Sequence, residues 1–362
     1  MVASCGSDDD DSSSQTTPAP AATAAPADTA APATTEAPAD TEAPAETAAP
    51  ADTAAPATTE APAAPAEGGA RVGVGGWSIA YIPQAIAMDR MNEMGYDIEA
   101  IQIAGTSAQM QAATQGAIDI TSVSAASTMA AIDAGLESRF FFTRNMNEFV
   151  LVAKAEFDSC ESLGGQRVAI HAQNDITGLL TLNWFEKNCP DAEPNVQIVE
   201  GSENRLAGLL QGQLDASPVD IGDALQIERE RPGEFIVLAQ FVEEFPVIQG
   251  VLAANPEWMA ENEQLIKDFI RLHLEVVAEF YADPASILPK AEELLPEIDP
   301  EVLAILVQAY ADAEIFPMDG NLDEADVDYT REFFADAGEL PNIDSYDDIA
   351  DRTYLDAVIA GS

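Results

Sequence analysis

The stretch Gln115-Gly-Ala-Ile-Asp119 returns 96 residues later as Gln211-Gly-Gln-Leu-Asp215, and Arg71-Val-Gly-Val74 returns at the same offset as Arg167-Val-Ala-Ile170. A further glycine keeps this spacing, Gly105 with Gly201. Such regular self-similarity indicates an internal duplication, and two copies are too few for a solenoid. We therefore predict two equivalent units, residues 71–123 and 167–219.

Each copy alternates short apolar runs with segments of helical period. In the first copy the apolar runs are residues 71–74, 98–103 and 118–123, and the helical segments are residues 82–94 and 108–115. This alternation is typical of βαβ units around a parallel sheet. Because parallel sheets bind ligands at the carboxyl ends of their strands, the duplication predicts two lobes with a cleft between them.

Residues 1–70 have a composition that cannot form a packed core. They are almost entirely Ala, Pro, Thr, Asp and Glu, and residues 23–39 are repeated without change as residues 47–63. Frequent Pro prevents helices, and too few large apolar side chains are present to offset the loss of chain entropy. We predict a disordered, partly extended linker.

In front of the linker, Val2-Ala-Ser-Cys5-Gly6 resembles the lipobox of bacterial lipoproteins, in which the Cys becomes the lipidated N-terminus. The alternative is a bare cysteine without an export signal. The long linker favours the lipid, because such an arm lets a domain reach away from a membrane. We expect Cys5 to anchor the protein to the outer face of a bacterial cell membrane.

The chain carries 64 acidic and 15 basic residues, a formal net charge of -49. This charge disfavours nucleic acid and anionic bilayers as partners. Two explanations stay open: a solvated acidic coat, or an acidic pocket for a cationic ligand. No apolar run approaches the roughly 20 residues that cross a bilayer, and residues 265–281 are predicted to form an amphipathic core helix.

If Cys5 is lipidated, Cys160 and Cys189 remain as a pair. In an exported protein an even remainder suggests a disulfide, the alternative being two independent buried thiols. The sequence contains neither a CxxC motif nor a Cys/His cluster, so we expect no metal site. A dinucleotide fingerprint fails because Ser78 stands at the third glycine position, and we expect no cofactor.

Two pairs of apolar runs predict the crossings between the lobes. The first pair lies within residues 139–154, and the second comprises residues 235–240 and 246–254. A hinge needs one strand-like crossing out of the first lobe and one back. The helical remainder, from residue 256, is expected to pack on the first lobe. The expected domains are residues 1–70 as anchor and linker, 71–150 with 250–362 as lobe 1, and 151–249 as lobe 2.

Several motifs together carry a family resemblance. They are Gly75-Gly-Trp77, Gly105-Thr-Ser107, Ser162-Leu-Gly-Gly-Gln-Arg-Val-Ala-Ile170 and Asp351-Arg-Thr-Tyr-Leu-Asp-Ala357, with the two Gln-Gly-x-apolar-Asp turns. Their order and spacing resemble the periplasmic binding proteins of ABC importers for nitrate, taurine, aliphatic sulfonates and thiamine pyrimidine precursors. The resemblance implies a type II periplasmic-binding-protein fold: two α/β lobes joined by two crossing segments, with the C-terminal helices on lobe 1. It also implies capture of a small molecule for a membrane permease. We expect a monomer.

The same resemblance leaves one alternative, an enzyme of pyrimidine-precursor synthesis. Such enzymes rely on a Cys-rich segment and a reactive His, and the three cysteines of this chain argue against one. His171 and His273 lie on different elements, which leaves little for a catalytic triad. We expect no enzymatic activity.

The loops after the predicted strands supply the candidate ligand contacts. In the first copy these are Trp77, Ser78, Tyr81, Thr106, Ser107, Ser122 and Ser124; in the second they are His171, Asn174, Thr177, Ser217 and Asp220. Hydroxyls at helix N-termini combine with backbone amides to hold an oxyanion, although each would also simply cap its helix.

The remaining candidates each have a structural alternative. We expect Trp77 and Tyr81 either to stack on a flat ligand or to pack in the core. We expect His171 either to contact the ligand or to be a structural residue. Asp220, with Glu203, is a candidate partner for a cationic or amine-bearing ligand, or else an N-cap. The repeated Asp119 and Asp215, at the opposite end of the sheets, are expected to be structural.

Overall fold

The computed structural model describes residues 68–173, 175–335, 340 and 342–361. The chain divides into two units, Met1–Ala61 and Pro62–Ser362, and every element below belongs to the second. Cys5, Asn174 and the predicted linker up to residue 67 lie outside the described residues.

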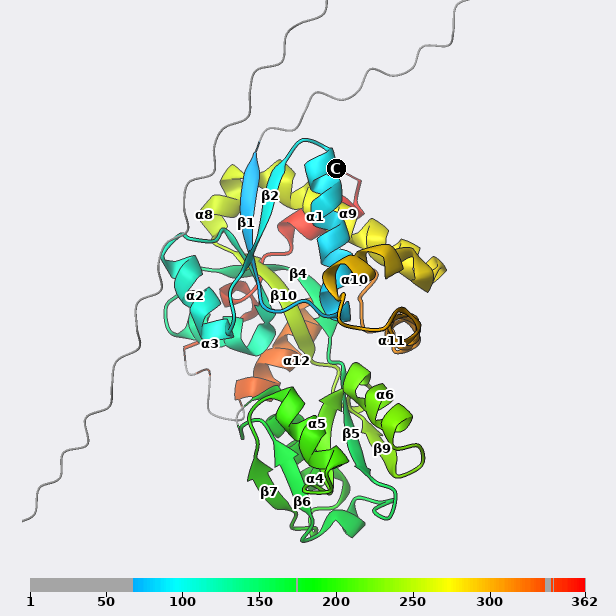
Figure 1. Cartoon of the computed structure of the whole chain (residues 1–362). Helices are drawn as coiled ribbons and strands as arrows, with labels where there is room; N and C mark the ends of the chain where they lie inside the picture. Colours follow the sequence, from blue (N-terminus) through cyan, green and yellow to red (C-terminus); the bar gives the residue numbers. More distant parts are fainter. Residues whose placement is uncertain (1–67, 174, 336–339, 341, 362) are drawn as a thin grey trace, which may run out of the picture. The chain divides into compact units, whose positions relative to one another are not determined.

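The first sheet has five strands in the order β2-β1-β3-β10-β4 (Figure 1). They are β1 (Gly69–Val74), β2 (Asp97–Gln102), β3 (Ile120–Ser124), β4 (Arg139–Met146) and β10 (Ile248–Ala254), with helices α1 (Ile82–Glu93), α2 (Thr106–Thr114) and α3 (Ala125–Asp133). β1 is parallel to β2 and β3, whereas β10 is antiparallel to β3 and β4. The repeated strands are therefore parallel as predicted, whereas β10, which lies outside the repeat, returns from the other lobe in the opposite direction.

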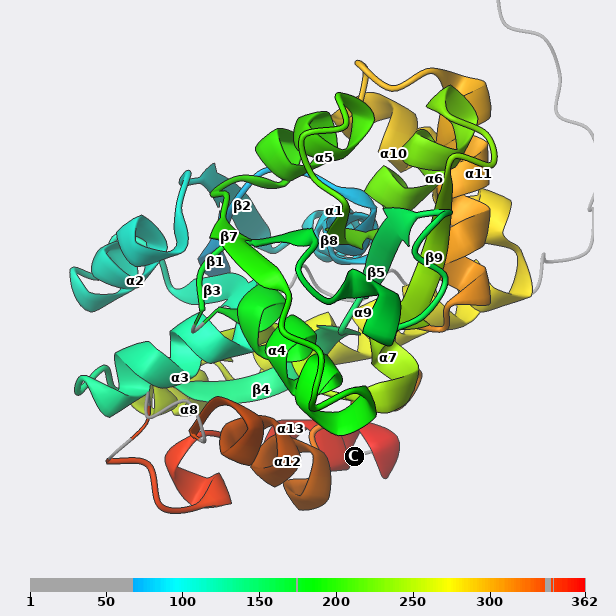
Figure 2. The same cartoon turned by 90° about the horizontal axis from the view of Figure 1, so that it is seen from below.

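The second sheet repeats this plan, in the order β7-β6-β8-β5-β9. Its elements are β5 (Phe149–Lys154), β6 (Arg167–Ile170), α4 (Ile176–Asn188), β7 (Asn195–Ile198), α5 (Ser202–Leu210), β8 (Ala216–Asp220), α6 (Ile221–Glu230) and β9 (Phe235–Gln240). β6 is parallel to β7 and β8, and β5 is antiparallel to β8 and β9. Helix α4 covers one face of the sheet, and α5 and α6 cover the other (Figure 2). In both sheets the fourth strand arrives from the other lobe.

Two crossings connect the sheets, as predicted. β4 continues into β5 through Asn147 and Glu148, and β9 returns to β10 through α7 (Phe241–Glu244) and residues 245–247. The Asn147 N–H donates to the Val247 carbonyl at 3.0 Å. The Gln249 side chain accepts from the Glu148 N–H and donates to Glu148 Oε1, both at 3.0 Å. The two crossings are therefore hydrogen-bonded to each other.

The C-terminal third of the chain is helical. It contains α8 (Pro256–Glu261), α9 (Glu263–Ala282), α10 (Leu288–Leu294), α11 (Pro300–Asp312), α12 (Glu324–Ala335) and α13 (Thr353–Ile359), with short 3₁₀ turns Pro284–Ile287 and Tyr346–Asp348. The predicted apolar stripe of α9 is buried, which confirms that helix as part of the core. Within the described residues, no helix combines the length and apolar character needed to cross a membrane.

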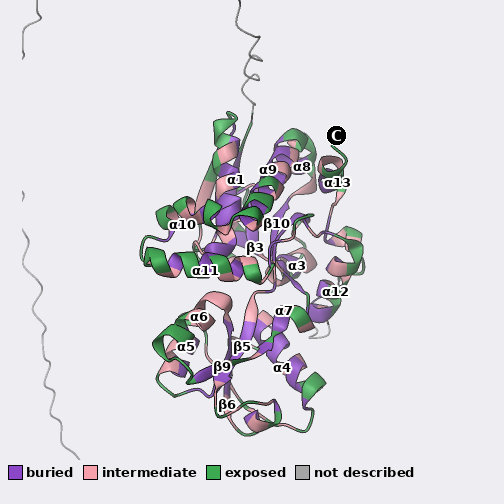
Figure 3. Ribbon diagram, turned by 90° about the vertical axis from the view of Figure 1, so that its right-hand side faces the viewer, coloured by how far each residue is buried: buried purple, intermediate pink, exposed green. Residues whose placement is uncertain are grey.

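The C-terminal segment also covers the outer edge of β4. The Phe140 N–H donates to the Ile349 carbonyl at 2.7 Å, and the Asp351 N–H donates to the Phe140 carbonyl at 2.8 Å. Phe140, Phe141 and Phe142 are consequently all buried. Figure 3 shows buried residues along the strands and on the inner sides of the helices.

The duplication extends to individual hydrogen bonds. Arg71 donates through its backbone N–H, Nε and Nη2 to the Asp119 carboxylate at 2.7–2.9 Å, and Arg167 makes the same three bonds to Asp215 at 2.7–3.0 Å. Each pair joins two adjacent strands of its sheet. These contacts are consistent with the structural role expected for both carboxylates.

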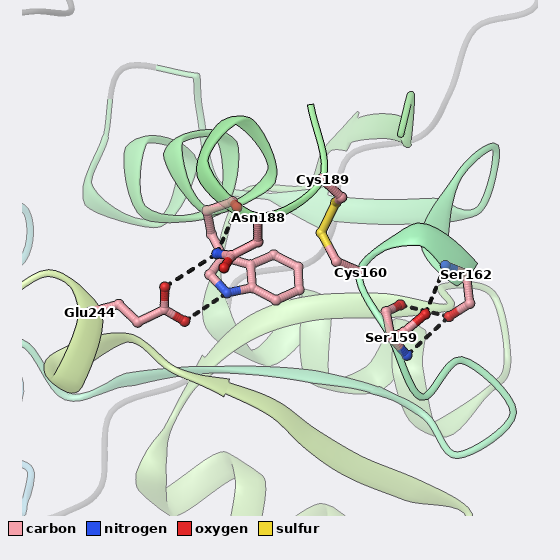
Figure 4. The surroundings of a disulfide bond; sticks show 7 residues. Ser159, Cys160, Ser162, Asn188, Cys189 and Glu244 are labelled. Atoms are coloured by element: carbon pink, nitrogen blue, oxygen red, sulfur yellow. Dashed lines mark hydrogen bonds between the residues drawn. A yellow bond between two sulfur atoms is a disulfide. The ribbon is translucent and has the colours of Figure 1, made fainter. Parts of the chain in front are cut away.

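A disulfide joins Cys160 to Cys189, with 5.9 Å between their Cα atoms. It connects the 3₁₀ turn Glu161–Leu163, which precedes β6, to the end of α4 (Figure 4). Close by, Trp184 Nε1 of α4 donates to Glu244 Oε1 at 2.9 Å. Helix α4 is thus tied both to its own lobe and to the returning crossing.

Candidate ligand-binding site

A cavity of about 580 Å³ is lined by residues from both lobes. Trp77 and Ser78, from the loop after β1, lie on one wall, and Asp220 and Asp223, at the start of α6, lie on another. Tyr310 of α11 also lines it. Three of the predicted residues, Trp77, Ser78 and Asp220, therefore meet at one cavity, at the carboxyl ends of β1 and β8.

Trp77 and Tyr81 lie in different surroundings. Their rings contact edge to face, with centroids 6.3 Å apart. Tyr81 is covered by the Arg144 guanidinium, whose Cζ lies 3.6 Å from the ring centroid, and its hydroxyl donates to the Ser122 carbonyl at 3.4 Å. Trp77 is left as the aromatic wall of the cavity.

Arg144 was not among the predicted site residues. It is 4% exposed, and its guanidinium donates to Ser122 Oγ at 2.9 Å and to Asn145 Oδ1 at 3.0 Å. The Ser122 hydroxyl in turn donates to Gln84 Oε1 at 2.7 Å. Ser122 is therefore fully engaged with protein groups, and it holds a buried cation in place.

Glu148, on the first crossing, is a second residue that the sequence did not identify. Its Oε1 accepts from Gln249, whereas its Oε2 is buried and has no hydrogen-bond partner among the described residues. Burial raises the pKa of Glu148, with nearby Tyr310 and Arg144 opposing the shift. The pKa of Tyr310 is raised well above its usual value, first by burial and then by the Glu148 charge.

Asp220 caps α6, because its Oδ1 accepts from the Asp223 N–H at 2.8 Å. Burial, and then the charges of Asp223 and Glu148, raise the pKa of Asp220 to about 7. Asp223 accepts from Ser202 Oγ at 2.7 Å, and burial raises its pKa as well. Asp220 thus fills the capping role that was its structural alternative and also faces the cavity.

The other predicted hydroxyls mostly bind the protein. Ser124 caps α3 by accepting from the Ser127 N–H at 3.2 Å. Ser217 is buried and donates to the Ala169 carbonyl at 3.3 Å. Thr106 and Ser107 open α2 after Gly105, whose φ is 86°. In the described part of the chain their side chains have no hydrogen-bond partner, so their role toward a ligand stays a prediction.

His171 and Thr177 stabilise their own loop. The Gly201 N–H donates to His171 Nδ1 at 3.2 Å, and the His171 N–H donates to Thr177 Oγ1 at 3.0 Å. Thr177 is buried and donates to Asp175 Oδ1 at 2.8 Å. Gly201, with φ of 85°, matches Gly105 of the first copy. These contacts support the structural alternative for His171.

His273 of α9 is fully buried, and both ring nitrogens lack a hydrogen-bond partner among the described residues. It packs between Phe142 and Phe269, with centroids 4.6 Å and 6.4 Å away. Burial, and then the nearby Arg144 charge, lower the pKa of His273 to about 3, so the ring is neutral. In the part of the chain that the structure describes, no group of three His, Cys, Asp or Glu residues is placed to hold a metal.

A larger cavity of about 760 Å³ lies along β9, α6 and the end of α11. Its lining is mainly apolar and includes Val150, Phe235 and Val237. None of the predicted ligand residues lines it, and it follows a sheet face rather than the loops at the strand ends. The smaller cavity is therefore the candidate ligand-binding site.

Comparison with known proteins identifies the family. Residues 91–287, more than half of the chain, match the family described as NMT1/THI5 like. The chain belongs to this family. No curated protein sequence matches it.

Solved structures similar to this NMT1/THI5-like chain include three from bacteria. The aliphatic sulphonate binding protein SsuA of Escherichia coli has a TM-score of 0.63 at 14% identity, covering 80% of this chain and 100% of its own. The nitrate-binding protein NrtA of Synechocystis PCC 6803 gives 0.62 at 11%, covering 81% and 88%. A zinc-bound ligand binding component of an ABC-type import system from Staphylococcus aureus gives 0.64 at 13%, covering 81% and 99%. The two-lobed periplasmic-binding-protein fold predicted from the sequence is confirmed.

Proposed function

We propose that this protein is the extracytoplasmic solute-binding component of an ABC importer. The observation that carries the proposal is the cavity at the carboxyl ends of β1 and β8, lined by Trp77 of one lobe and Asp220 of the other. A solute held by both walls stabilises the state in which the lobes are shut, so closure follows binding. The similar structures named above include binding proteins for sulphonate and nitrate.

The two crossings provide the hinge for this motion. They are short, and hydrogen bonds of Asn147 and of the Glu148–Gln249 pair hold them together. A few residues at the ends of elements are sufficient to absorb domain closure. The closed form would then dock on a membrane permease, which the protein would serve as a monomer.

We favour a solute-binding protein over an enzyme of pyrimidine-precursor synthesis. Cys160 and Cys189 form a disulfide, which removes their thiols as nucleophiles. Buried His273 is neutral and lies in the core between Phe142 and Phe269. The described cavity lining offers carboxylates, the Arg229 guanidinium and the rings of Trp77 and Tyr310, which suit recognition.

The attachment proposed for the protein is a lipid on Cys5, followed by the Ala/Pro/Thr-rich linker. Expression in a lipoprotein-processing host with an alkyne-tagged fatty acid tests it: the label should enter the wild type and be absent from a Cys5→Ala variant. Equal labelling of both proteins would contradict the lipid site.

The transport proposal itself is tested by melting the full chain in the presence of small solutes. The panel contains sulfonates, taurine, nitrate, thiamine pyrimidine precursors, amines and quaternary ammonium compounds. A ligand that binds only the folded state stabilises it by about 2.7 kcal/mol when its concentration is a hundred times Kd. The melting temperature rises accordingly. At least one class should stabilise the protein. A panel without any stabilising compound, together with turnover of a pyrimidine precursor, would reverse the proposal in favour of the enzyme.

A further inference from the structure

The wall of the 580 Å³ cavity carries an excess of negative charge. Its described lining includes five carboxylate side chains and one guanidinium: Asp220, Asp223, Glu230, Glu297 and Asp299 against Arg229. The buried cations nearby, Arg144 and Arg205, do not line it. Arg144 binds Ser122 and Asn145, and Arg205 donates to the Val199 carbonyl at 3.2 Å. Because the lining carboxylates outnumber the cations, a positive charge entering the cavity would be attracted.

A second observation is the buried carboxylate of Glu148. Its Oε2 is buried without a well-aligned hydrogen bond from the described residues, and the Tyr310 hydroxyl interacts with the same carboxylate. The Glu148 charge acts on both Asp220 and Tyr310, which line the cavity. The Glu148 carboxylate does not itself line the cavity, but it adds negative charge close to two residues that do.

The helix terminus in the cavity is closed to an anion. The N-terminus of a helix is normally an anion site, because its first amides lack partners. In α6 that place is taken by the Asp220 carboxylate, which accepts from Asp223 N–H at 2.8 Å. An oxyanion at this position would meet two carboxylates instead of free amides.

Trp77 supplies the complementary aromatic surface. It lines the same cavity, contacts the Tyr81 ring edge to face at 6.3 Å, and packs on its other sides against the apolar core. Trp is the side chain that attracts cations most strongly through its face. A cavity lined by both an aromatic ring and carboxylates suits a solute that has an apolar body and a positive end.

We propose that this cavity selects a positively charged organic solute, an amine or quaternary ammonium compound, over sulfonates, nitrate and other anions. The inference rests on the proposed function and names its substrate class. It also favours the acidic-pocket explanation for part of the chain's negative charge.

The proposal has a proton signature. The groups facing Asp220 are Asp223 of its own helix, Glu148 of the crossing, Tyr310 of α11 and Arg205 of α5. A bound cation favours the ionised form of the carboxylates, so binding should release a proton near neutral pH, and affinity should rise between pH 6 and pH 8. A bound anion would produce proton uptake and the opposite trend.

The experiment uses a matched series on the full chain: cadaverine, 5-aminopentanoate and glutarate, followed by choline and pentanesulfonate. Melting temperature and calorimetric affinity are measured at pH 6, 7 and 8, in two buffers with different ionisation enthalpies. We expect cadaverine or choline to stabilise the protein, with proton release, and glutarate and pentanesulfonate to have no effect. Asp220→Asn keeps the cap and should weaken the bound amine at least about tenfold. The exposed Asp158→Asn variant is the control and should bind as the wild type does.

The outcomes separate the two proposals. Stabilisation by glutarate, pentanesulfonate or nitrate, with the amines inactive, overturns the cation inference and leaves solute binding intact. Absence of stabilisation across this series and the wider transport panel overturns both. An amine that binds Asp220→Asn as tightly as the wild type also overturns the inference, and the melting temperature of the free variant shows whether it is folded.

Discussion

Arg144 is a buried charge whose guanidinium donates hydrogen bonds to neutral groups among the described residues. Removing a guanidinium from water is costly, and here Ser122 Oγ, Asn145 Oδ1 and the face of Tyr81 offset that cost. The guanidinium also restricts its neighbour on β10. A Cβ added at Gly250 would lie 2.5 Å from Arg144 Nη2 and would also collide with Asn145 Oδ1.

Replacement of Gly250 by Ala should therefore destabilise the protein. Overpacking of a rigid site costs about 1–3 kcal/mol, and we expect a loss of free energy of unfolding in that range. Gly76→Ala is the matched control, since a Cβ there meets no atom within 4 Å. Urea unfolding checks both variants. Equal midpoints for the two would contradict the packing described around Arg144.

Trp77→Ala should separate ligand affinity from fold stability. The ring lines the cavity and is only partly buried, so we expect at least about a tenfold loss of affinity for the best stabilising solute and a stability loss of about 1–2 kcal/mol. Asp119→Ala should lower fold stability and leave ligand affinity nearly unchanged, because its carboxylate binds Arg71 away from the cavity. Parallel losses of affinity and stability in both variants would contradict this assignment.

At the scale of elements, the Arg71–Asp119 and Arg167–Asp215 ion pairs of the two copies are not equally strong. Asp215 receives Lys154 Nζ at 2.6 Å in addition to Arg167, and its side chain is 7% exposed, against 17% for Asp119. Asp215→Asn should therefore cost about 2–4 kcal/mol and Asp119→Asn about 1–2 kcal/mol. Chemical denaturation at pH 7 measures the difference. An equal cost would mean that Lys154 adds nothing.

The pH dependence of the stability that the Arg167–Asp215 pair contributes follows from the lowered pKa of Asp215. Hydrogen bonds from Arg167, and further bonds from Lys154, hold the pKa of Asp215 well below its ordinary 3.8. The resulting stability is present above the ordinary pKa and is lost as the pH falls toward the folded value. The difference in free energy of unfolding between the wild type and Asp215→Asn should therefore shrink as the pH falls from 5 to 2. A gap that is constant over this range would contradict the assignment.

The stability that Asp220 contributes should depend on pH with the opposite sign. Burial raises its pKa to about 7, so its contribution is fully present below pH 3.8 and is lost as the pH rises through 7. Ligand-free Asp220→Asn should gain stability relative to the wild type between pH 6 and pH 8, by about 1–3 kcal/mol. Melting curves across this range measure the gain. Identical pH profiles would show that Asp220 does not titrate as described.

Much of the element order was predictable from the sequence because it depends on local periodicity. The repeat placed the strands of both sheets, and the alternation of apolar runs located β4, β5, β9 and β10. The direction of β10 was not predictable in this way. Periodicity reports that a strand exists, whereas its direction depends on which lobe the chain has just left.

The site was predictable only in part. Trp77, Ser78 and Asp220 follow strands directly, so topology alone brought them to one cavity. Arg144 and Glu148 were missed because their partners lie far away in sequence, at Ser122 and Gln249. Their signal was a charged side chain within apolar strand segments. Tyr310 gave no comparable signal, since it belongs to a helix whose contact with α6 is purely tertiary.

At the scale of the whole molecule, the duplication and the hinge act together. Each sheet contributes one cavity wall, and each receives its fourth strand from the other lobe. In the proposed function, motion about Asn147 and Glu148 would open or shut the cavity without disrupting either sheet. The buried Glu148 carboxylate lies at this hinge, close to the charges of the cavity wall.

The most direct test measures the distance between the lobes. Spin labels at Gln115→Cys and Gln211→Cys, exposed and equivalent positions of the two copies, would be compared by pulsed electron resonance in a Cys5→Ala background. The solute that raises the melting temperature most should move the distance distribution to a new, narrower maximum. A distribution that is unchanged at saturating solute would contradict the claim that the two lobes close on a small molecule.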